Sequence, residues 1–179
     1  MEVVWYLDRA TALVAYALLY LAMLTGIFYN ADGYDTLRDA ARRVHVELSV
    51  LAMLVTIGHA VVGVLDTVLV LGGQVPPPSY SPAYMVAGVT VGAGALLLLV
   101  VAVLGFLDAR RFERPWAGRV VHAFAYGGFA FATVHAAAVG TDVVTLVRPG
   151  LVAGLVFLGY VLLLRLLGEE AVEARRTPQ

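Results

Sequence analysis

The sequence contains no cysteine and only four histidines among its 179 residues. The absence of cysteine excludes disulfides, cysteine-ligated zinc, iron–sulfur clusters and thioether-attached haem. Charged residues are also scarce, at 14% of the chain, whereas 61% of the residues are hydrophobic. A soluble domain of this size could not cover so much apolar surface, so the sequence predicts an integral membrane protein.

Five stretches reach the length that a membrane-spanning helix needs, about 20 mainly apolar residues. They cover approximately residues 10–28, 44–71, 85–107, 120–139 and 151–167. The segments between them are charged or rich in proline and glycine, which favours connections outside the membrane. The sequence therefore predicts an all-α membrane protein, with one bundle of five transmembrane helices over residues 1–168. A short solvated tail is expected over residues 169–179.

Arginine is distributed unevenly over the predicted connections. If the spans alternate in direction, one side of the membrane carries ten arginines and the other carries only Arg9 and Arg148. The ten are Arg38, Arg42, Arg43, Arg110, Arg111, Arg114, Arg119, Arg165, Arg175 and Arg176. Cytoplasmic loops are enriched in positive charge, so the arginine-rich side is predicted to be cytoplasmic. We expect a multi-pass plasma-membrane protein with its N-terminus outside and its C-terminus in the cytoplasm.

All four histidines lie in the second and fourth predicted spans. His45 and His59 are 14 residues apart, and His122 and His135 are 13 residues apart. The two spans run in the same direction, so one histidine of each is expected near the cytoplasmic face and the other near the outer face. At 1.5 Å per residue the two levels are roughly 20 Å apart. We therefore expect His45 to pair with His122, and His59 to pair with His135.

Paired imidazoles at two depths are the ligands that two bis-histidine haems need. A proton path usually recruits membrane carboxylates as well, and the acids of this chain are expected near helix ends rather than in the middle of the bundle. A zinc ion would need its ligands clustered within a few ångströms. The sequence thus favours two haem b groups, an inner one held by His45 and His122 and an outer one held by His59 and His135.

Three arginines lie beside the predicted inner ligands and are placed to pair with haem propionates. They are Arg42, Arg43 and Arg119. The same residues suit the role of positive anchors at the cytoplasmic face, and the two roles are compatible.

The two histidine spacings differ in their helical phase. Fourteen residues make nearly four turns, whereas thirteen make about 3.6 turns, which leaves His122 and His135 on different faces of an ideal helix. We therefore predict a tightened or kinked turn near Gly127–Gly128, or haems that are offset around the bundle.

The segments RRVHVELSVLAMLVTIGH and GRVVHAFAYGGFAFATVH resemble the histidine helices of the ferric reductase-like transmembrane domain. That family includes NADPH oxidases, metalloreductases and the haem subunit of a methionine sulfoxide reductase. It carries H-x13-H on one helix and H-x12-H on the second helix after it. The resemblance covers essentially all five spans, and Arg9 falls where the oxidases keep an outer-side arginine. It implies a di-haem b-type cytochrome that moves electrons across the membrane.

Two departures from the family pattern limit what this resemblance implies. Gly63 stands where the oxidases carry an additional histidine, which disfavours superoxide production. The oxidases and metalloreductases also fuse a flavin and nicotinamide domain after the last span, whereas only a short polar tail follows Leu167. We therefore expect an electron-transfer subunit of an oxidoreductase, whose electron donor and acceptor are separate proteins or a quinone.

Three functions stay open at this point. The first is a transmembrane electron conduit between separate redox partners. The second is a reduced cytochrome b subunit of a quinol-oxidising complex, although the link at residues 108–119 is shorter than in that family. The third is a haem-free membrane subunit that scaffolds partners or forms an ion path. In all three cases we expect the protein to contact the lipid bilayer and to bind no nucleic acid. Each function is also compatible with a subunit of a larger membrane complex.

Overall fold

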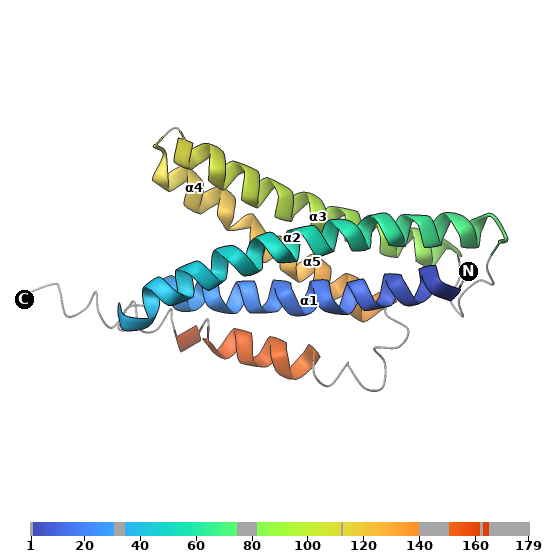
Figure 1. The fold of residues 1–179 in the computed structure, drawn as a ribbon, viewed down its shortest axis with the longest axis horizontal. Coiled ribbons are helices and arrows are strands. Elements are labelled where there is room, and N and C mark those ends of the chain that lie inside the picture. The colour runs from blue at the N-terminus through green and yellow to red at the C-terminus, as the bar shows by residue number, and fades with distance from the viewer. Residues whose placement is uncertain are drawn as a thin grey trace, which may run out of the picture.

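The computed structural model describes residues 2–30, 35–74, 82–111, 113–139, 151–161 and 163–164. These residues are almost entirely helical and include no strand. The labelled helices are α1 (Glu2–Asn30), α2 (Asp35–Leu71), α3 (Pro82–Arg111), α4 (Pro115–His122) and α5 (Phe124–Val139). A shorter apolar helix follows at Leu151–Val161 (Figure 1).

Four segments are long and apolar enough to cross a membrane. They are Val3–Phe28, Arg38–Leu71, Ala83–Asp108 and Trp116–Val139, the last of which combines α4 with α5. For the described residues, this confirms the predicted all-α fold with helices that are able to span a membrane. The fifth predicted span is only partly described, because Leu151–Val161 is too short to cross by itself and residues 165–167 lie outside the described residues. The predicted tail at residues 169–179 also lies outside them.

Two helix starts lie earlier in the chain than predicted. The helix α1 begins at Glu2 rather than near Ala10, so three charged residues, Glu2, Asp8 and Arg9, belong to the helix. The helix α2 begins at Asp35 and includes most of the segment that we expected to be a polar connection. Its 37 residues correspond to about 55 Å, whereas the hydrocarbon core is about 30 Å thick. The charged first turns of α2 therefore extend beyond the apolar layer.

The helices form two hairpins that cross each other (Figure 1). In the first hairpin α1 packs along α2, and in the second α3 packs along both α4 and α5. Contacts between the hairpins are few and involve mainly α2 with α3 and α1 with α5. The helices that carry the histidines, α2 and the α4–α5 pair, scarcely touch each other through their backbones.

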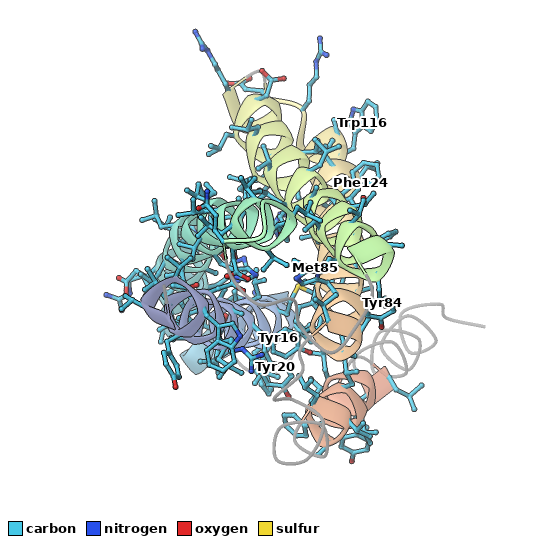
Figure 2. The ribbon with its side chains drawn as sticks, turned by 90° about the vertical axis from the view of Figure 1, so that its right-hand side faces the viewer. Tyr16, Tyr20, Tyr84, Met85, Trp116 and Phe124 are labelled. Atoms are coloured by element: carbon cyan, nitrogen blue, oxygen red, sulfur yellow. The ribbon has the colours of Figure 1, made fainter. Side chains whose placement is uncertain are left out.

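A small apolar core joins the two hairpins near their crossing. It is built from one buried residue of each long helix: Leu19, Ala52, Leu99 and Phe129. The ring of Tyr16 on α1 stacks on Phe129 with centroids 5.6 Å apart, and its hydroxyl lies 3.1 Å from the hydroxyl of Thr133 on α5. Tyr20 donates a hydrogen bond of 3.1 Å to the carbonyl of Gly154, which fixes the shorter helix against α1 (Figure 2).

The fourth span is interrupted at Ala123 rather than at the predicted Gly127–Gly128. The amide of Ala123 bonds the carbonyls of both Arg119 and Val120, and the amide of Tyr126 bonds the carbonyl of Ala123 at 3.1 Å. Bonds that reach back three residues are those of a tighter 3₁₀ turn. A tightened turn therefore exists between the two histidines, but the predicted position is wrong.

The glycine pair has a different role, which explains the error. Gly128 is buried, and a Cβ at this position would lie 2.8 Å from Cγ of Leu99 and 3.2 Å from the carbonyl oxygen of Ala95. Gly128 thus lets α5 approach α3 closely, as small residues do in membrane helices.

Replacing Gly128 with alanine should force α3 and α5 apart. We expect Gly128→Ala to lower the free energy of unfolding by about 1–3 kcal/mol, the usual cost of overpacking. The measurement is resistance of the purified protein to SDS denaturation. Gly159→Ala is the matched control, because its Cβ would meet nothing within 4 Å. Equal stability of the two variants would contradict the tight contact of α3 with α5.

Candidate functional site

The structure brings together the histidine pairs that the sequence predicted. The imidazole centroids of His45 and His122 lie 6.0 Å apart, and those of His59 and His135 lie 6.1 Å apart. In each pair one ring comes from α2 and the other from the α4–α5 span. The two levels thus sit between the two hairpins, where their backbones make few contacts.

The backbone of α1 holds the ring of His45. Its Nδ1 lies 2.8 Å from the carbonyl oxygen of Ala22. A carbonyl oxygen can only accept a hydrogen bond, so Nδ1 carries the proton and donates it. In the neutral ring, Nε2 then keeps its lone pair available for a metal.

The same arrangement occurs at the level of His59 and His135, with α3 in place of α1. Nδ1 of His135 lies 2.8 Å from the carbonyl oxygen of Gly88 and donates to it. Each hairpin therefore fixes one histidine: the first hairpin fixes His45 and the second fixes His135.

A glycine one turn after each accepting carbonyl makes room for the ring. A Cβ at Gly26 would lie 3.0 Å from Cε1 of His45, and a Cβ at Gly92 would lie 3.1 Å from Nδ1 of His135. The Cα–Cβ bond of a helical residue points toward the helix N-terminus, so a side chain at the fourth position after a carbonyl covers that carbonyl. Glycine leaves the oxygen open to a second donor.

The other two histidines have different surroundings. Nδ1 of His59 lies 3.1 Å from Oδ1 of Asp8, which is an ion-pair distance, although neither atom makes a hydrogen bond. The ring of His122 packs on Phe106 with centroids 5.1 Å apart. Its Nδ1 is buried and has no hydrogen-bond partner among the described residues. The two levels therefore differ in polarity.

The spacing within each pair fits one metal ion between two imidazoles. A metal–imidazole bond is about 2 Å long, so two ring nitrogens on opposite sides of one ion are about 4 Å apart and the ring centres about 6 Å apart. Among the described residues no group of three or more His, Asp or Glu gathers as a metal site. Each pair therefore offers two facing ligands, and any further ligands of an ion would come from other groups.

The apolar core separates the two levels. Ala52 lies seven residues from both His45 and His59, and it is completely buried. Phe129 occupies the corresponding position on α5, between His122 and His135. Buried apolar side chains therefore lie between the two levels.

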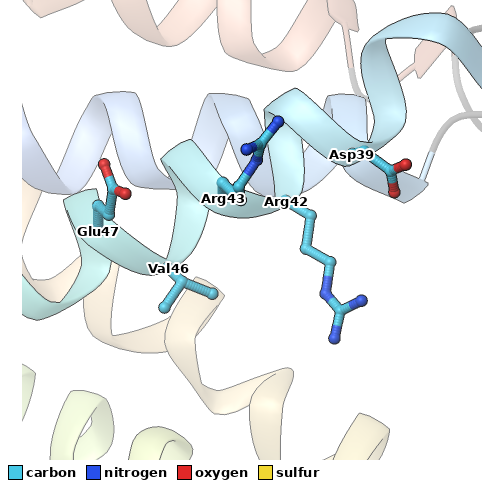
Figure 3. A pocket seen from close by; sticks show the side chains of 5 residues that line it. All are labelled: Asp39, Arg42, Arg43, Val46 and Glu47. Carbon is cyan, nitrogen blue, oxygen red and sulfur yellow. The ribbon is translucent and has the colours of Figure 1, made fainter.

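The predicted arginines lie at the surface near the inner pair. Arg42 and Arg43 line an open hollow of about 470 Å³ at the start of α2, together with Asp39, Val46 and Glu47 (Figure 3). Their side chains leave the helix in different directions, as consecutive helical residues must. Arg119 is exposed on α4, one turn before His122, and is not among the residues that line this hollow. The structure thus keeps all three near the inner level without uniting them in one site.

Sequence reasoning missed the groups that orient the histidines. The accepting carbonyls belong to Ala22 and Gly88, and no side-chain pattern identifies a carbonyl. The glycines that expose them, Gly26 and Gly92, were a detectable signal, because each interrupts an apolar helix at the depth of a histidine. Asp8 was also missed, although an acid inside an apolar helix suggests a functional site.

The described fold and site define a class of protein: a helical membrane protein with two histidine pairs at two depths between its hairpins. The chain belongs to the family described as domain of unknown function DUF8596, whose model matches residues 3–142. The matched region contains α1 to α5 and all four histidines, and it ends before the helix Leu151–Val161. No curated protein and no solved structure matches the chain.

Proposed function

We propose that this protein is a membrane b-type cytochrome subunit that carries electrons across the bilayer between separate redox partners. The main support for the proposal is that the two imidazole rings of each pair lie close together, with centroids 6.0 Å apart in one pair and 6.1 Å apart in the other. His45 and His122 hold the inner haem b, and His59 and His135 hold the outer one. Haem held in this way supplies reversible one-electron chemistry at each level.

Three features of the chain support this assignment. The carbonyls of Ala22 and Gly88 fix the tautomer of one histidine in each pair, which would leave Nε2 as the ligand of an iron. The weak packing between the hairpins leaves the histidine helices apart at the backbone level. The apolar core between the levels is a poor path for a proton or an ion, and this favours electron transfer.

The arginine distribution supports one orientation of the molecule. The start of α2 and the α3–α4 link carry most of the arginines of the described residues, so this end is assigned to the cytoplasm. The N-terminus then lies outside the plasma membrane, and a fifth span that includes Leu151–Val161 returns the C-terminus to the cytoplasm. Arg42, Arg43 and Arg119 are then positioned to bind the propionates of the inner haem.

The resemblance to the ferric reductase-like transmembrane domain supports the same proposal through the two histidine spacings. Relatives of that kind receive electrons from a flavin on the cytoplasmic side. The proposed partners are a protein or a quinone that supplies electrons and a second partner that accepts them outside.

Membranes that contain the protein should show a b-type α-band in a dithionite-reduced minus oxidised spectrum. His45→Ala and His135→Ala should each remove about half of the haem, because each variant destroys one of two ligand pairs. Gly58→Ala is the matched control beside His59, since a Cβ there would meet nothing within 4 Å. Haem content is measured from the pyridine haemochrome of protein purified in detergent.

A wild-type protein that stays colourless after haem supplementation would overturn the proposal in favour of a haem-free membrane subunit. Titration with a quinol analogue separates the remaining functions. A saturable shift of the haem spectrum would favour the subunit of a quinol-oxidising complex over a conduit between proteins.

The glycine opposite His135 provides a test of ligand positioning. Gly92→Ala should displace the imidazole from the carbonyl of Gly88 and weaken binding of the outer haem by about 10–100-fold, as losses of partners of a metal ligand do. Gly94→Ala is the control on the same helix, because its Cβ would only reach ordinary contact with Phe131 at 4.0 Å. Both proteins are purified and dialysed against apomyoglobin, and the haem they retain is measured. Equal retention would show that the carbonyl contact does not position the ligand.

A further inference from the structure

A charged side chain distinguishes the outer histidine pair from the inner one. At the outer level His59 faces the carboxylate of Asp8 at 3.1 Å, and His135 donates to a carbonyl. At the inner level His45 donates to a carbonyl, whereas Nδ1 of His122 has no hydrogen-bond partner among the described residues. The outer pair therefore receives more negative charge than the inner pair.

The position of Asp8 is built into the packing of α1 against α2. Gly63 lies one turn after His59, and a Cβ there would lie 3.1 Å from Oδ1 of Asp8 and 4.0 Å from Cε1 of His59. The glycine thus provides the space that the carboxylate occupies. The side chains of Asp8 and His59 are only 25% and 19% exposed, so water screens their interaction weakly.

Two further charged groups complete this outer cluster, which consists of Asp8, Arg9, His59 and Asp66. Asp66 interacts electrostatically with both Asp8 and Arg9. The guanidinium of Arg9 also lies 3.7 Å over the ring of Trp5. Within this cluster, the carboxylate of Asp8 is the charged group at ion-pair distance from His59.

We propose that Asp8 is a positioning residue for His59 and that its carboxylate gives the outer haem a lower reduction potential than the inner haem. This inference rests on the proposed function. At 3.1 Å the charge of the carboxylate favours a proton on Nδ1 without a hydrogen bond to it, which would leave the lone pair of Nε2 for an iron. The carboxylate also makes the imidazole a stronger electron donor, and its negative charge favours the more positive, oxidised iron. Both effects lower the potential at which the outer site accepts its electron.

The test is a redox titration of the α-band of the full-length protein, purified with its haems. Asp8→Asn removes the charge and keeps a side-chain oxygen in nearly the same place. At the potential at which the wild-type outer site is half reduced, we expect its reduced-to-oxidised ratio to rise about tenfold, which for one electron equals about 59 mV. Asp8→Glu keeps the charge and should restore the wild-type ratio. Asp66→Asn is the control for general charge and should produce a markedly smaller rise.

The single-haem variants assign each component of the titration. His45→Ala keeps only the outer pair, so Asp8→Asn should shift its curve. His135→Ala keeps only the inner pair, whose curve should not move. If either variant loses both haems, the two components of the wild-type curve serve instead, and only the lower one should shift.

The outcomes separate this inference from the proposed function. Absence of haem from the wild-type protein would overturn the proposed function. Normal haem content with no shift in Asp8→Asn, or an equal shift of both components, would overturn only the role of Asp8.

Discussion

The candidate site depends on two backbone carbonyls that histidine side chains can reach. In the apolar layer an imidazole N–H without an acceptor is costly, and His45 and His135 each meet a carbonyl acceptor. Carbonyls of a helix are normally occupied by their own helix and covered by the side chain one turn later. Gly26 and Gly92 remove that cover for Ala22 and Gly88. The exposed carbonyls determine how the rings of His45 and His135 are oriented. Nδ1 of each ring donates a hydrogen bond to its carbonyl, so only Nε2 remains free to face the opposite hairpin.

As a result of this constraint, each of the two hairpins orients one histidine. The α1–α2 hairpin orients its inner histidine, His45, and the α3–α5 hairpin orients its outer histidine, His135. Each pair therefore combines one ring that its own hairpin fixes with one that the opposite hairpin presents. The hairpins need little direct contact for this purpose, and a compact core around Phe129 is enough to set their crossing. A bundle packed along its whole length would leave no room between the rings of a pair.

The sequence predicted the histidine pairs well because helical periodicity and span direction determine which residues share a depth. His45 and His122 could be matched from the alternation of spans alone, and the structure brings their rings together. The boundaries of α1 and α2 were predicted less well, because hydropathy marks the apolar layer while helices continue through charged turns such as Asp35–Arg43. The contact of Asp8 with His59 could not be predicted, because it depends on the rotation of α1 about its axis, and apolar composition alone does not determine that rotation.

The tightened turn at Ala123 accounts for part of the unequal histidine spacing. Thirteen residues fall about 140° short of four helical turns, and three residues of 3₁₀ geometry recover about 60° of this difference. The turn follows directly after His122, so it rotates this residue relative to the rest of the span. His122 consequently packs on Phe106 and finds no hydrogen-bond partner among the described residues, whereas His135 reaches the carbonyl of Gly88. The polarity difference between the two levels thus begins in the backbone of the fourth span, and the contact of Asp8 with His59 increases it.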